Sequence, residues 1–319
     1  MNSKVLVTGG CGFIGVNLCK LLLKKSYPVI VLDNFSQRNP DMVYRICDSP
    51  GASDFEVQKG DVRNREDIQQ VMGQVEFVVH LAASTNVRES IREPEIDMEH
   101  NSMGTFKILE CARKSSSVQK VIFASSNAAV GNVQGAVDET CVPEPISPYG
   151  ASKLHGEALC KTYYHTYDLD TTVFRFANVY GPYSKHKSSV ITKFITRAQN
   201  NLDLPIYGDG NQTRDFIHVD DIARAIVKTL ESDRPSGEIY QVATGRETAI
   251  NKLAETILQL ASNDGFGVEI EYEDPRPGEI HKNFSSIDKI ERELNWNPEV
   301  DLQEGLTDLW NWFIQESMN

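Results

Sequence analysis

The sequence has no excess of positive charge and no long apolar run. Its 319 residues include 32 lysines and arginines against 45 aspartates and glutamates, giving a net charge of −13 and a pI of about 5.1. Binding to a nucleic-acid backbone needs clustered positive charge, so nucleic acid is not an expected partner. Every apolar stretch falls short of the roughly 18 residues that suggest a membrane-spanning helix, so no membrane partner is expected either.

Cysteines are few and scattered. The six stand at positions 11, 19, 47, 111, 141 and 160, without a Cys-x-x-Cys pair or a histidine at metal-ligand spacing. This distribution predicts neither a disulfide framework nor a metal site. The chain also enters a strand-like run at residues 4–7 without the apolar segment and cleavage site of a secretory leader. We therefore expect reduced thiols, no bound metal and a cytoplasmic location.

The first half of the chain alternates short β-branched runs with longer amphipathic stretches. Periods of two and of 3.6 residues predict strands and helices in turn. Strands are expected at residues 5–7, 29–32, 55–58, 77–81, 121–124 and 171–175, and helices at residues 13–25, 66–72, 96–113 and 148–167. Repeated strand–helix–strand units predict an α/β fold, a Rossmann-type doubly wound parallel sheet with helices on both faces.

The pattern becomes looser after about Pro182. Helical stretches at residues 190–199, 220–231, 250–260 and 302–314 are separated by turns rich in glycine and proline. No long linker, repeat or low-complexity tract divides the chain. The sequence therefore predicts a dinucleotide-binding domain over residues 1–182, to which some later segments return, and a smaller mixed α/β substrate-binding lobe over residues 183–319.

Glycines 9, 12 and 15 stand between the first predicted strand and the first predicted helix. In such a turn Gly9 permits a tight bend, Gly12 lets backbone N–H groups approach a pyrophosphate, and Gly15 lets helix and strand pack closely. The second strand is followed by Asp33. A carboxylate there holds the ribose diol of an adenosine and repels a 2′-phosphate, so the pattern predicts NAD rather than NADP.

Three further residues follow or end predicted strands on the side where the cofactor is expected, and each has an expected role. Arg38, a few residues past Asp33, is placed to weaken the preference for NAD. Asp61, in Gly60-Asp61-Val62 after the third strand, is the expected partner of the adenine amino group. His80 ends a buried strand and is expected to be a packed structural histidine rather than a proton shuttle.

Tyr149 and Lys153 stand four residues apart at the start of a predicted helix, directly after Pro148. Residues at i and i+4 share a helix face, so the ammonium is expected beside the phenol. Nearby positive charge, including that of a nicotinamide ring, would lower the tyrosine pKa from about 10 and make it a base for a sugar or alcohol hydroxyl. Ser126, or Ser125 as second choice, would complete a Ser–Tyr–Lys set from the end of the preceding strand.

In this order the motifs resemble the extended short-chain dehydrogenase/reductase superfamily, specifically its NAD-dependent epimerase/dehydratase group acting on nucleotide sugars. The similarity runs from Lys4 to the C-terminal helices. It also rests on the segments HLAA at residues 80–83, Asn101 with Gly104-Thr105, RFANVYGP at 175–182, QTRDF at 212–216 and RPGE at 276–279.

The resemblance implies a role for most of these positions. It assigns to the cofactor Gly9, Gly12, Phe13, Ile14, Gly15, Asp33, Asn34, Asp61, Val62, Leu81, Ala82, Ala83, Asn101, Tyr149, Lys153 and Phe176. It assigns to a nucleotide sugar Ser84, Val87, Ser125, Ser126, Asn127, Tyr149, Asn178, Ser189, Val190, Phe194, Tyr207, Arg214, Arg276 and Asn283. In the second set, Asn178, Arg214 and Arg276 are implied to hold the diphosphate, and residues 189–191 with Phe194 to cup the base.

The residues after the strand-end serine bear on the reaction that the resemblance implies. Hexose 4,6-dehydratases of the group carry Asp and Glu there, and decarboxylases carry Glu, whereas this chain has Ser126-Asn127-Ala128. A C4 epimerase with recycled NAD is therefore expected, acting through a 4-keto intermediate that turns over in the site. A dehydratase, decarboxylase or 4-reductase is the alternative. A non-enzymatic nucleotide-sensing scaffold is disfavoured, because Gly12, Tyr149 and Lys153 are all present.

The resemblance also bears on the sugar and on assembly. Asn283 falls where N-acetyl bulk is gated, and asparagine is smaller than the tyrosine of strict glucose/galactose enzymes. UDP-GlcNAc/UDP-GalNAc is thus expected beside UDP-Glc/UDP-Gal, or the uronic acid form. The tyrosine that many relatives carry before Gly131 is absent, which reshapes the sugar pocket. A homodimer is implied, formed by a four-helix bundle of residues 96–113 and 148–167, with a role in polysaccharide biosynthesis.

Overall fold

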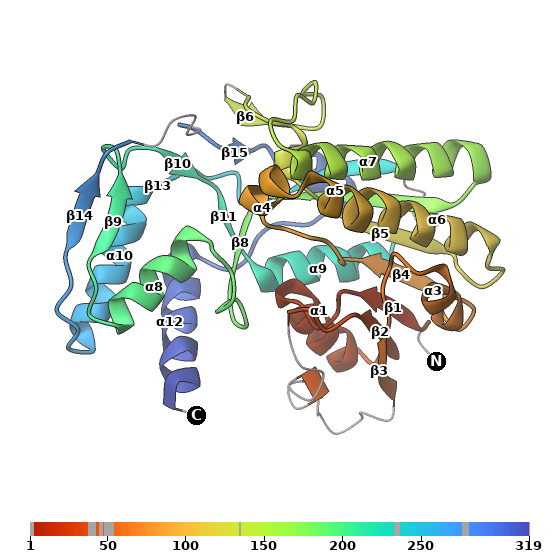
Figure 1. Ribbon diagram of the computed structural model, residues 1–319, viewed down its shortest axis with the longest axis horizontal. Coiled ribbons are helices and arrows are strands. Elements are labelled where there is room, and N and C mark those ends of the chain that lie inside the picture. Colours follow the sequence, from red (N-terminus) through yellow and green to blue (C-terminus); the bar gives the residue numbers. More distant parts are fainter. Residues whose placement is uncertain are drawn as a thin grey trace.

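The computed structural model describes residues 3–37, 43–44, 47, 54–133, 135–232, 237–275 and 281–318. In these residues seven parallel strands form a central sheet in the order β12-β7-β5-β4-β1-β2-β3. Figure 1 labels the part of this order that runs from β5 to β3. The strands are β1 (Val5–Thr8), β2 (Val29–Asp33), β3 (Phe55–Lys59), β4 (Phe77–His80), β5 (Lys120–Ser126), β7 (Asp170–Phe176) and β12 (Glu238–Val242). The predicted Rossmann-type fold is confirmed. Strand order reverses between β1 and β4, and ligands of open α/β sheets bind outside the carboxyl ends at such a point.

Helices cover both faces of the sheet because side chains alternate along each strand. In β1, Val5 and Val7 belong to one buried cluster and Leu6 to another. The first cluster includes residues of α1 (Phe13–Lys24), α9 (Val219–Leu230) and α11 (Asp288–Leu294), and the second those of α3 (Arg65–Met72), α6 (Gly104–Lys114) and α7 (Pro148–Tyr167). Burial on both faces explains why the inner strands β1, β2 and β4 are almost continuously apolar in sequence.

The helix predicted over residues 96–113 contains a π-helical turn and is preceded by a separate short helix. The chain forms α4 (Val87–Arg92), α5 (Pro94–Asp97) and a π-helical turn η2 (Met98–Met103) before α6. Pro94 is the first residue of α5 and has no N–H with which to continue α4. In the π turn, Asn101 Nδ2 donates to Ser152 Oγ of α7 at 3.2 Å. Periodicity alone does not reveal such a turn, although π turns often mark functional sites.

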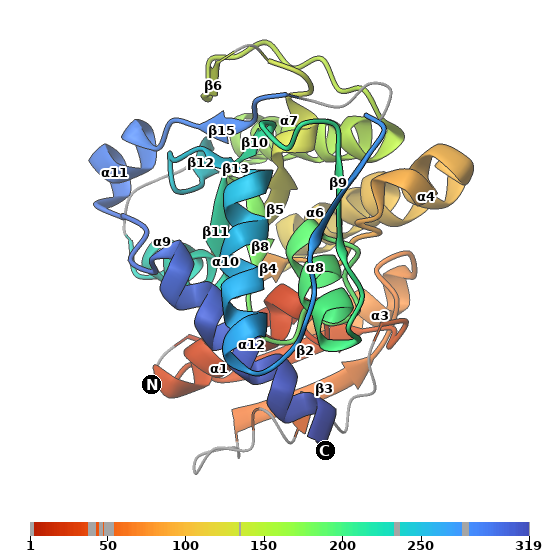
Figure 2. The same ribbon diagram turned by 90° about the vertical axis from the view of Figure 1, so that its left-hand side faces the viewer.

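The smaller lobe has its own core, which includes Trp310 and Phe313. Its helices are α8 (Val190–Gln199), α10 (Ile250–Asn263) and α12 (Leu302–Met318). They begin at the predicted residues, and α10 and α12 run a few residues further. The paired strands β9 (Leu204–Tyr207) and β14 (Ile270–Glu273) lie beside α8 and α10 (Figure 2).

Three short ladders bring later segments against the sheet domain or against each other. They pair β8 (Asn178–Tyr180) with β11 (Phe216–His218), β10 (Thr213–Arg214) with β13 (Thr248–Ala249), and β6 (Ala136–Val137) with β15 (Phe284–Ser285). From the second half of the chain, α9, β12 and α11 return to the central sheet. The six cysteines all lie in described residues and form no disulfide. Across the same residues, no helix has the length and apolar character to cross a membrane.

Candidate active site

The turn between β1 and α1 packs against the chain that leaves β4. Gly9 has φ +70°, and a Cβ there would stand 2.8 Å from Ala82 Cα, so this approach requires glycine. A Cβ on Gly15 would stand 2.4 Å from the Gly9 carbonyl oxygen. Helix α1 begins after Gly12 without a side-chain cap on its first N–H groups. The turn therefore has the backbone form that suits a dinucleotide pyrophosphate.

Asp33 lies beside this turn at the end of β2. Its carboxylate accepts hydrogen bonds from Cys11 N at 3.0 Å and from Phe35 N at 2.8 Å. These two bonds fix the carboxylate at the edge of the sheet where an adenosine ribose is expected. Arg38, predicted to weaken the preference for NAD, lies outside the described residues.

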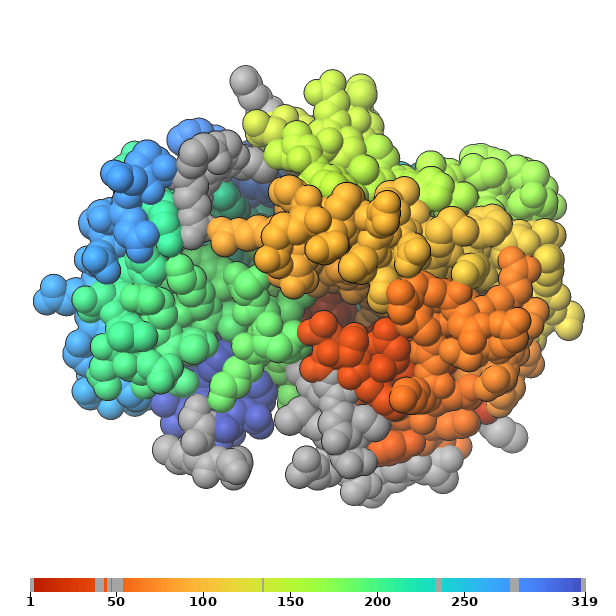
Figure 3. Space-filling view, viewed as in Figure 1, coloured from red at the N-terminus to blue at the C-terminus, as the bar shows by residue number. Residues whose placement is uncertain are grey.

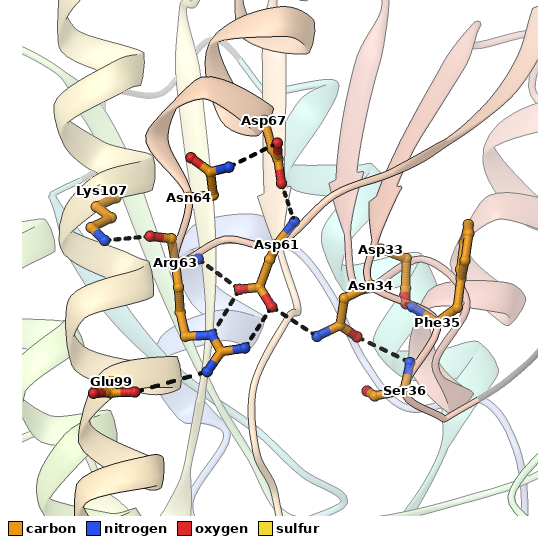
Figure 4. Close-up of polar contacts among 10 residues, drawn as sticks. All are labelled: Asp33, Asn34, Phe35, Ser36, Asp61, Arg63, Asn64, Asp67, Glu99 and Lys107. Carbon is orange, nitrogen blue, oxygen red and sulfur yellow. Dashed lines mark hydrogen bonds and ion pairs between the residues drawn. The ribbon is translucent and has the colours of Figure 1, made fainter.

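Asp61 is more heavily bonded than its sequence position indicates (Figure 4). Arg63 donates to Oδ1 from its backbone N and its Nε, at 2.8 and 3.0 Å. Arg63 Nη2 and Asn34 Nδ2 donate to Oδ2, at 2.9 and 3.1 Å. The hydrogen bond from the Arg63 side chain holds the pKa of this carboxyl well below its usual range. A carboxylate offers about four acceptor positions, so an adenine amino group would have to displace one of these donors.

His80 is buried in a directed chain of hydrogen bonds. Ala82 N donates to Thr8 Oγ1 at 3.3 Å, and Thr105 Oγ1 donates to Asn101 O at 2.6 Å. The Thr105 oxygen is then left to accept from His80 Nε2, at 3.1 Å, while Nδ1 accepts from Thr8 Oγ1 at 2.7 Å. Burial lowers the pKa of His80 to about 3. His80 is thus a neutral structural histidine, in agreement with its expected role.

Tyr149 and Lys153 lie on the buried face of α7, next to the end of β5. Tyr149 shares a hydrogen bond with Ser126. Lys153 Nζ donates to Ala124 O at 2.8 Å and stands 5.9 Å from the centroid of the Tyr149 ring. The structure therefore brings together the three residues of the predicted catalytic set.

The pKa of Tyr149 is raised in the chain by itself, whereas the lowered pKa predicted for it includes the charge of a nicotinamide ring. Burial raises this pKa to about 12; the hydrogen bond with Ser126 opposes the rise and the charge of Asp97 adds to it. Burial also lowers the pKa of Lys153 to about 8, although Asp97 and Glu157 act in the opposite direction. Loss of hydration is thus the largest influence on the pKa of both groups. Ionisation of Tyr149 at neutral pH therefore needs positive charge beyond that of Lys153.

Ser125, the second choice for the catalytic serine, points elsewhere. Its Oγ donates to Glu157 Oε1 at 2.5 Å inside the protein. Arg175 Nε and Nη2 donate to the same carboxylate at 2.9 and 2.7 Å, and this ion pair is almost completely buried. Ser125 is thus part of a structural network, and Ser126 is the serine that faces Tyr149.

Asn101 joins the chain after β4 to the helix of the catalytic pair. Its Oδ1 accepts from Ser84 N at 2.8 Å, and its Nδ2 donates to Ser84 O at 3.0 Å as well as to Ser152. Other residues assigned to the cofactor lie near the same edge: Phe13 and Ile14 begin α1, Val62 follows β3, Leu81 and Ala83 follow β4, and Phe176 ends β7. In the sheet register Phe176 pairs with Ser126.

The asparagines assigned to the sugar side differ in their surroundings. Asn127 Nδ2 donates to Ser285 Oγ at 2.8 Å, and the side chain is buried. Asn178 is exposed, and its Nδ2 donates to the Asp215 carbonyl oxygen at 3.1 Å. Asn283 is half-buried, and its Oδ1 has no hydrogen-bond partner among the described residues.

The residues assigned to the base lie on α8 and β9. Ser189 caps the N-terminus of α8, and Val190 is half-buried. Lys193 Nζ lies 5.2 Å from the centroid of the Tyr207 ring. Phe194 is 1% exposed in the core of the smaller lobe. Its side chain therefore supports the lobe and presents no surface to a ligand, because an aromatic side chain on the inner face of α8 packs between helices.

The predicted diphosphate arginines and Val87 complete the sugar side. Arg214 lies on β10, is half-buried, and donates from Nη1 to Thr213 O at 2.7 Å. Arg276 lies outside the described residues. Val87 begins α4 and is partly exposed.

Lys187 is a basic group at the site that sequence reasoning missed. Its Nζ donates to Thr85 Oγ1 at 2.8 Å, so the chain before α8 contacts the chain that follows β4. The charge of Lys187 contributes to the lowered pKa of Lys153. The cluster Lys185-His186-Lys187 was its only sequence signal. Figure 3 shows a hollow in the surface near the point where the orange, red-orange and green segments meet.

Comparison with known proteins connects this site to a family. The family model of GDP-mannose 4,6 dehydratase matches residues 6–309. A putative UDP-glucose 4-epimerase of Methanocaldococcus jannaschii is 38% identical over 313 residues, 97% of each chain. The structure of UDP-N-acetylglucosamine 4-epimerase from Methanobrevibacter ruminantium M1 matches with a TM-score of 0.90 at 31% identity, covering 99% of both chains. The dTDP-glucose 4,6-dehydratase of Streptomyces venezuelae, solved with NAD bound, has a TM-score of 0.88 at 32% identity, with 99% and 98% covered.

Proposed function

We propose that this chain, which belongs to the GDP-mannose 4,6-dehydratase family of extended short-chain dehydrogenases/reductases, is an NAD-dependent C4 epimerase of a UDP-hexose. The family comprises NAD-dependent nucleotide-sugar epimerases and dehydratases. The observation that carries the narrower proposal is the Ser126–Tyr149–Lys153 set, in which Ser126 is followed at the end of β5 by Asn127 and Ala128 instead of carboxylates.

The residues present fit NAD. Gly9 and Gly15 leave no room for a Cβ, the first N–H groups of α1 carry no side-chain cap, and Asp33 is fixed at the end of β2. These features would hold the pyrophosphate and the adenosine ribose. When bound, NAD supplies a hydride acceptor and donor for sugar C4 and a positive ring charge.

Tyr149 moves the proton in this proposal. Its phenolate oxygen takes the proton of the C4 hydroxyl and later returns it, while Ser126 bonds the same hydroxyl. Lys153 has a pKa of about 8 and therefore stays mainly protonated at neutral pH, where it favours the phenolate. Because the protein by itself raises the pKa of Tyr149 to about 12, the tyrosine remains a phenol until further positive charge reaches it.

The surroundings of the set favour epimerisation over elimination of water. Elimination from C5 and C6 needs a second acid and base beside the sugar. Asn127 donates to Ser285 and carries no ionisable group, and Asp97, which acts electrostatically on Tyr149, is buried. Without such a pair, a 4-keto sugar bound in this site can only take the hydride back at C4, which gives the starting sugar or its 4-epimer.

Asn283 supports acceptance of an N-acetylated hexose. Its Oδ1 is buried without a partner among the described residues, and such an oxygen suits the N–H of an N-acetyl group. UDP-GlcNAc/UDP-GalNAc is therefore our first substrate pair, with UDP-Glc/UDP-Gal or the uronic acid form as the others. Asn178 and Arg214 would bind the diphosphate.

The test incubates the NAD-loaded protein with UDP-GlcNAc, UDP-glucose and UDP-glucuronate in separate reactions. NMR of the products should show the 4-epimer of at least one, with no net change at the reduced-nicotinamide absorbance band. A stable 4-keto-6-deoxy sugar would identify a dehydratase, and loss of the carboxyl carbon a decarboxylase. Net oxidation of added NADH would identify a 4-reductase. Tyr149→Phe is the control for a contaminating enzyme.

The proposal includes a homodimer. Apolar side chains gather on the exposed side of the segment α4–η2: Ile91, Ile96, Met98 and Met103 are 45–61% exposed. Burying such a patch against its symmetry mate is a common reason for dimerisation. Sedimentation equilibrium should give a dimer that Ile96→Glu weakens, and a monomeric wild type at micromolar concentration would refute it. A cytoplasmic location and a role in polysaccharide biosynthesis stay predictions.

A further inference from the structure

Asp97, the last residue of α5, is a carboxylate buried behind the catalytic helix. It is 1% exposed. Its Oδ2 accepts from Asn101 Nδ2 at 3.0 Å, whereas Oδ1 is buried and has no hydrogen-bond partner among the described residues. A buried oxygen without a partner costs about 1–3 kcal/mol and more when charged, so such a group calls for an explanation.

The bonds around Asp97 lead to both sides of the active site. Asn101, which Asp97 holds from one side, bonds the backbone N and O of Ser84 in the chain after β4. The same amide reaches Ser152 Oγ, and that hydroxyl donates to Tyr149 O at 2.9 Å. The Asp97 carboxylate thus sets the position of the Asn101 amide. This amide joins the cofactor side of the site to the first turn of α7.

We propose that Asp97 is a positioning residue of the catalytic set: its carboxylate orients Asn101 and places one negative charge behind Tyr149 and Lys153. The proposal rests on the proposed function in taking Tyr149 as the base. A merely structural aspartate would need only the bond to Asn101. A positioning aspartate also has to influence the ionisation of the phenol, and this is the property that separates the two.

The charges around the pair support this role. Lys153 is faced by Asp97 from α5, by Glu157 from its own helix, by Lys187 from the chain before α8 and by neutral His80 at the end of β4. Tyr149 is faced by Ser126 and Asp97. The charge of Asp97 raises the pKa of both Tyr149 and Lys153. It therefore keeps the lysine protonated and opposes early ionisation of the phenol.

The experiment measures the phenolate absorbance of the NAD-loaded protein as a function of pH, without any sugar. Subtracting the titration of Tyr149→Phe isolates the contribution of Tyr149. Asp97→Asn keeps the shape of the side chain and an acceptor for Asn101 but removes the charge. We expect its Tyr149 midpoint to move to lower pH, by on the order of one pH unit. Asp97→Glu should bring the midpoint back toward that of the wild type.

Asp221→Asn is the matched control. Asp221 is also a fully buried carboxylate, but it lies on α9 and bonds Arg224 and the backbone N of Glu299. Its loss should lower Tm and leave the Tyr149 midpoint in place. An unmoved midpoint in Asp97→Asn would overturn the proposal, as would an equal shift in the control.

A second variant covers the case in which Asp97→Asn does not fold. Asp97→Ser also removes the charge and must give a shift in the same direction. Failure of both variants to fold, while Asp97→Glu folds, would assign Asp97 to stability alone and overturn the proposal. The titration uses no sugar, so the protein can fail to epimerise every nucleotide sugar tested and the role of Asp97 is still decided.

Discussion

The cofactor side and the sugar side of the site are built differently. On the cofactor side, the glycine turn, His80 and Ser126 lie at the ends of strands of one seven-stranded sheet, and Tyr149 and Lys153 lie on α7 next to the end of β5. Their positions are fixed by close backbone contacts and by buried hydrogen bonds such as that from Lys153 to Ala124. On the sugar side, Asn178, Arg214 and Asn283 lie on or beside ladders of two or three residues per strand.

This difference places the groups proposed for the reaction on or next to the central sheet and the groups proposed to select the sugar on the short ladders. A substitution in a short ladder can change a side chain that meets the sugar without disturbing the sheet, because few other groups depend on it. A substitution at a strand end of the central sheet disturbs several neighbours at once. The sheet should therefore carry the reaction shared by relatives that differ in their sugars.

The largest expected effect is a loss of turnover without a loss of fold or of bound NAD. Tyr149→Phe should lower kcat about a thousandfold, because it removes the only proposed proton acceptor. Bound NAD, released by denaturation and measured by absorbance, should stay at the wild-type level. Tyr167→Phe, on the same helix but 48% exposed, should keep the wild-type rate. A Tyr149→Phe rate within tenfold of wild type would exclude this tyrosine as the base.

The next effect tests the backbone of the cofactor side. Gly15→Ala should lower the free energy of unfolding by about 3 kcal/mol and abolish NAD binding, because its Cβ would overlap the Gly9 carbonyl oxygen at 2.4 Å. Urea unfolding and calorimetric titration with NAD measure the two quantities. Gly73→Ala is the matched control, since its Cβ meets no atom within 4 Å. It should be neutral or stabilising by up to about 1 kcal/mol. Equal behaviour of the two variants would contradict the close-packed turn.

A smaller effect concerns the buried imidazole of His80 on the cofactor side, which should make the free energy of unfolding depend on pH. The pKa of His80 is about 3 in the folded protein and about 6.5 in the unfolded chain. Between these values the unfolded chain binds a proton that the folded protein does not, so stability falls as pH falls below 6.5. The free energy of unfolding should decrease by about 2 kcal/mol from pH 7 to pH 5 through this group. Urea unfolding at both pH values should show a smaller decrease in His80→Gln. An identical decrease would mean that His80 is protonated in the fold.

The smallest effect probes the sugar side. Arg214→Ala should raise KM for the nucleotide sugar about tenfold through loss of a charge-assisted bond to phosphate, with little change in kcat or Tm. Arg292→Ala, an exposed arginine on α11, should change neither kinetic constant. If Arg214→Ala instead lowered Tm strongly, the contrast between a rigid cofactor side and a tolerant sugar side would fail.

Local sequence patterns predicted the sheet and the centre of the site. The glycine turn, Asp33 and the pair Tyr149/Lys153 are readable because each is a short motif next to a strand or at a helix start. The π turn at Met98–Met103, the contact between Lys187 and Thr85, and the role of Glu157 were not predicted. Each depends on groups brought together by tertiary packing, which periodicity does not encode. The effect of burial on the pKa of Tyr149 in the chain by itself was not predicted for the same reason, since burial is a property of the folded chain.

The buried ion pair of Glu157 and Arg175, with Ser125 on the same carboxylate, constrains how this gene can change. Glu157 follows Lys153 by one helical turn, and Ser125 precedes Ser126 by one residue. A single inserted residue between Lys153 and Glu157 would rotate one against the other by about 100°. Either the Lys153 amine would then lose its hydrogen bond to Ala124 O, or the Glu157 carboxylate would lose its ion pair with Arg175. Descendants of this sequence can therefore lengthen their surface loops freely, but this interval has to be inherited at fixed length.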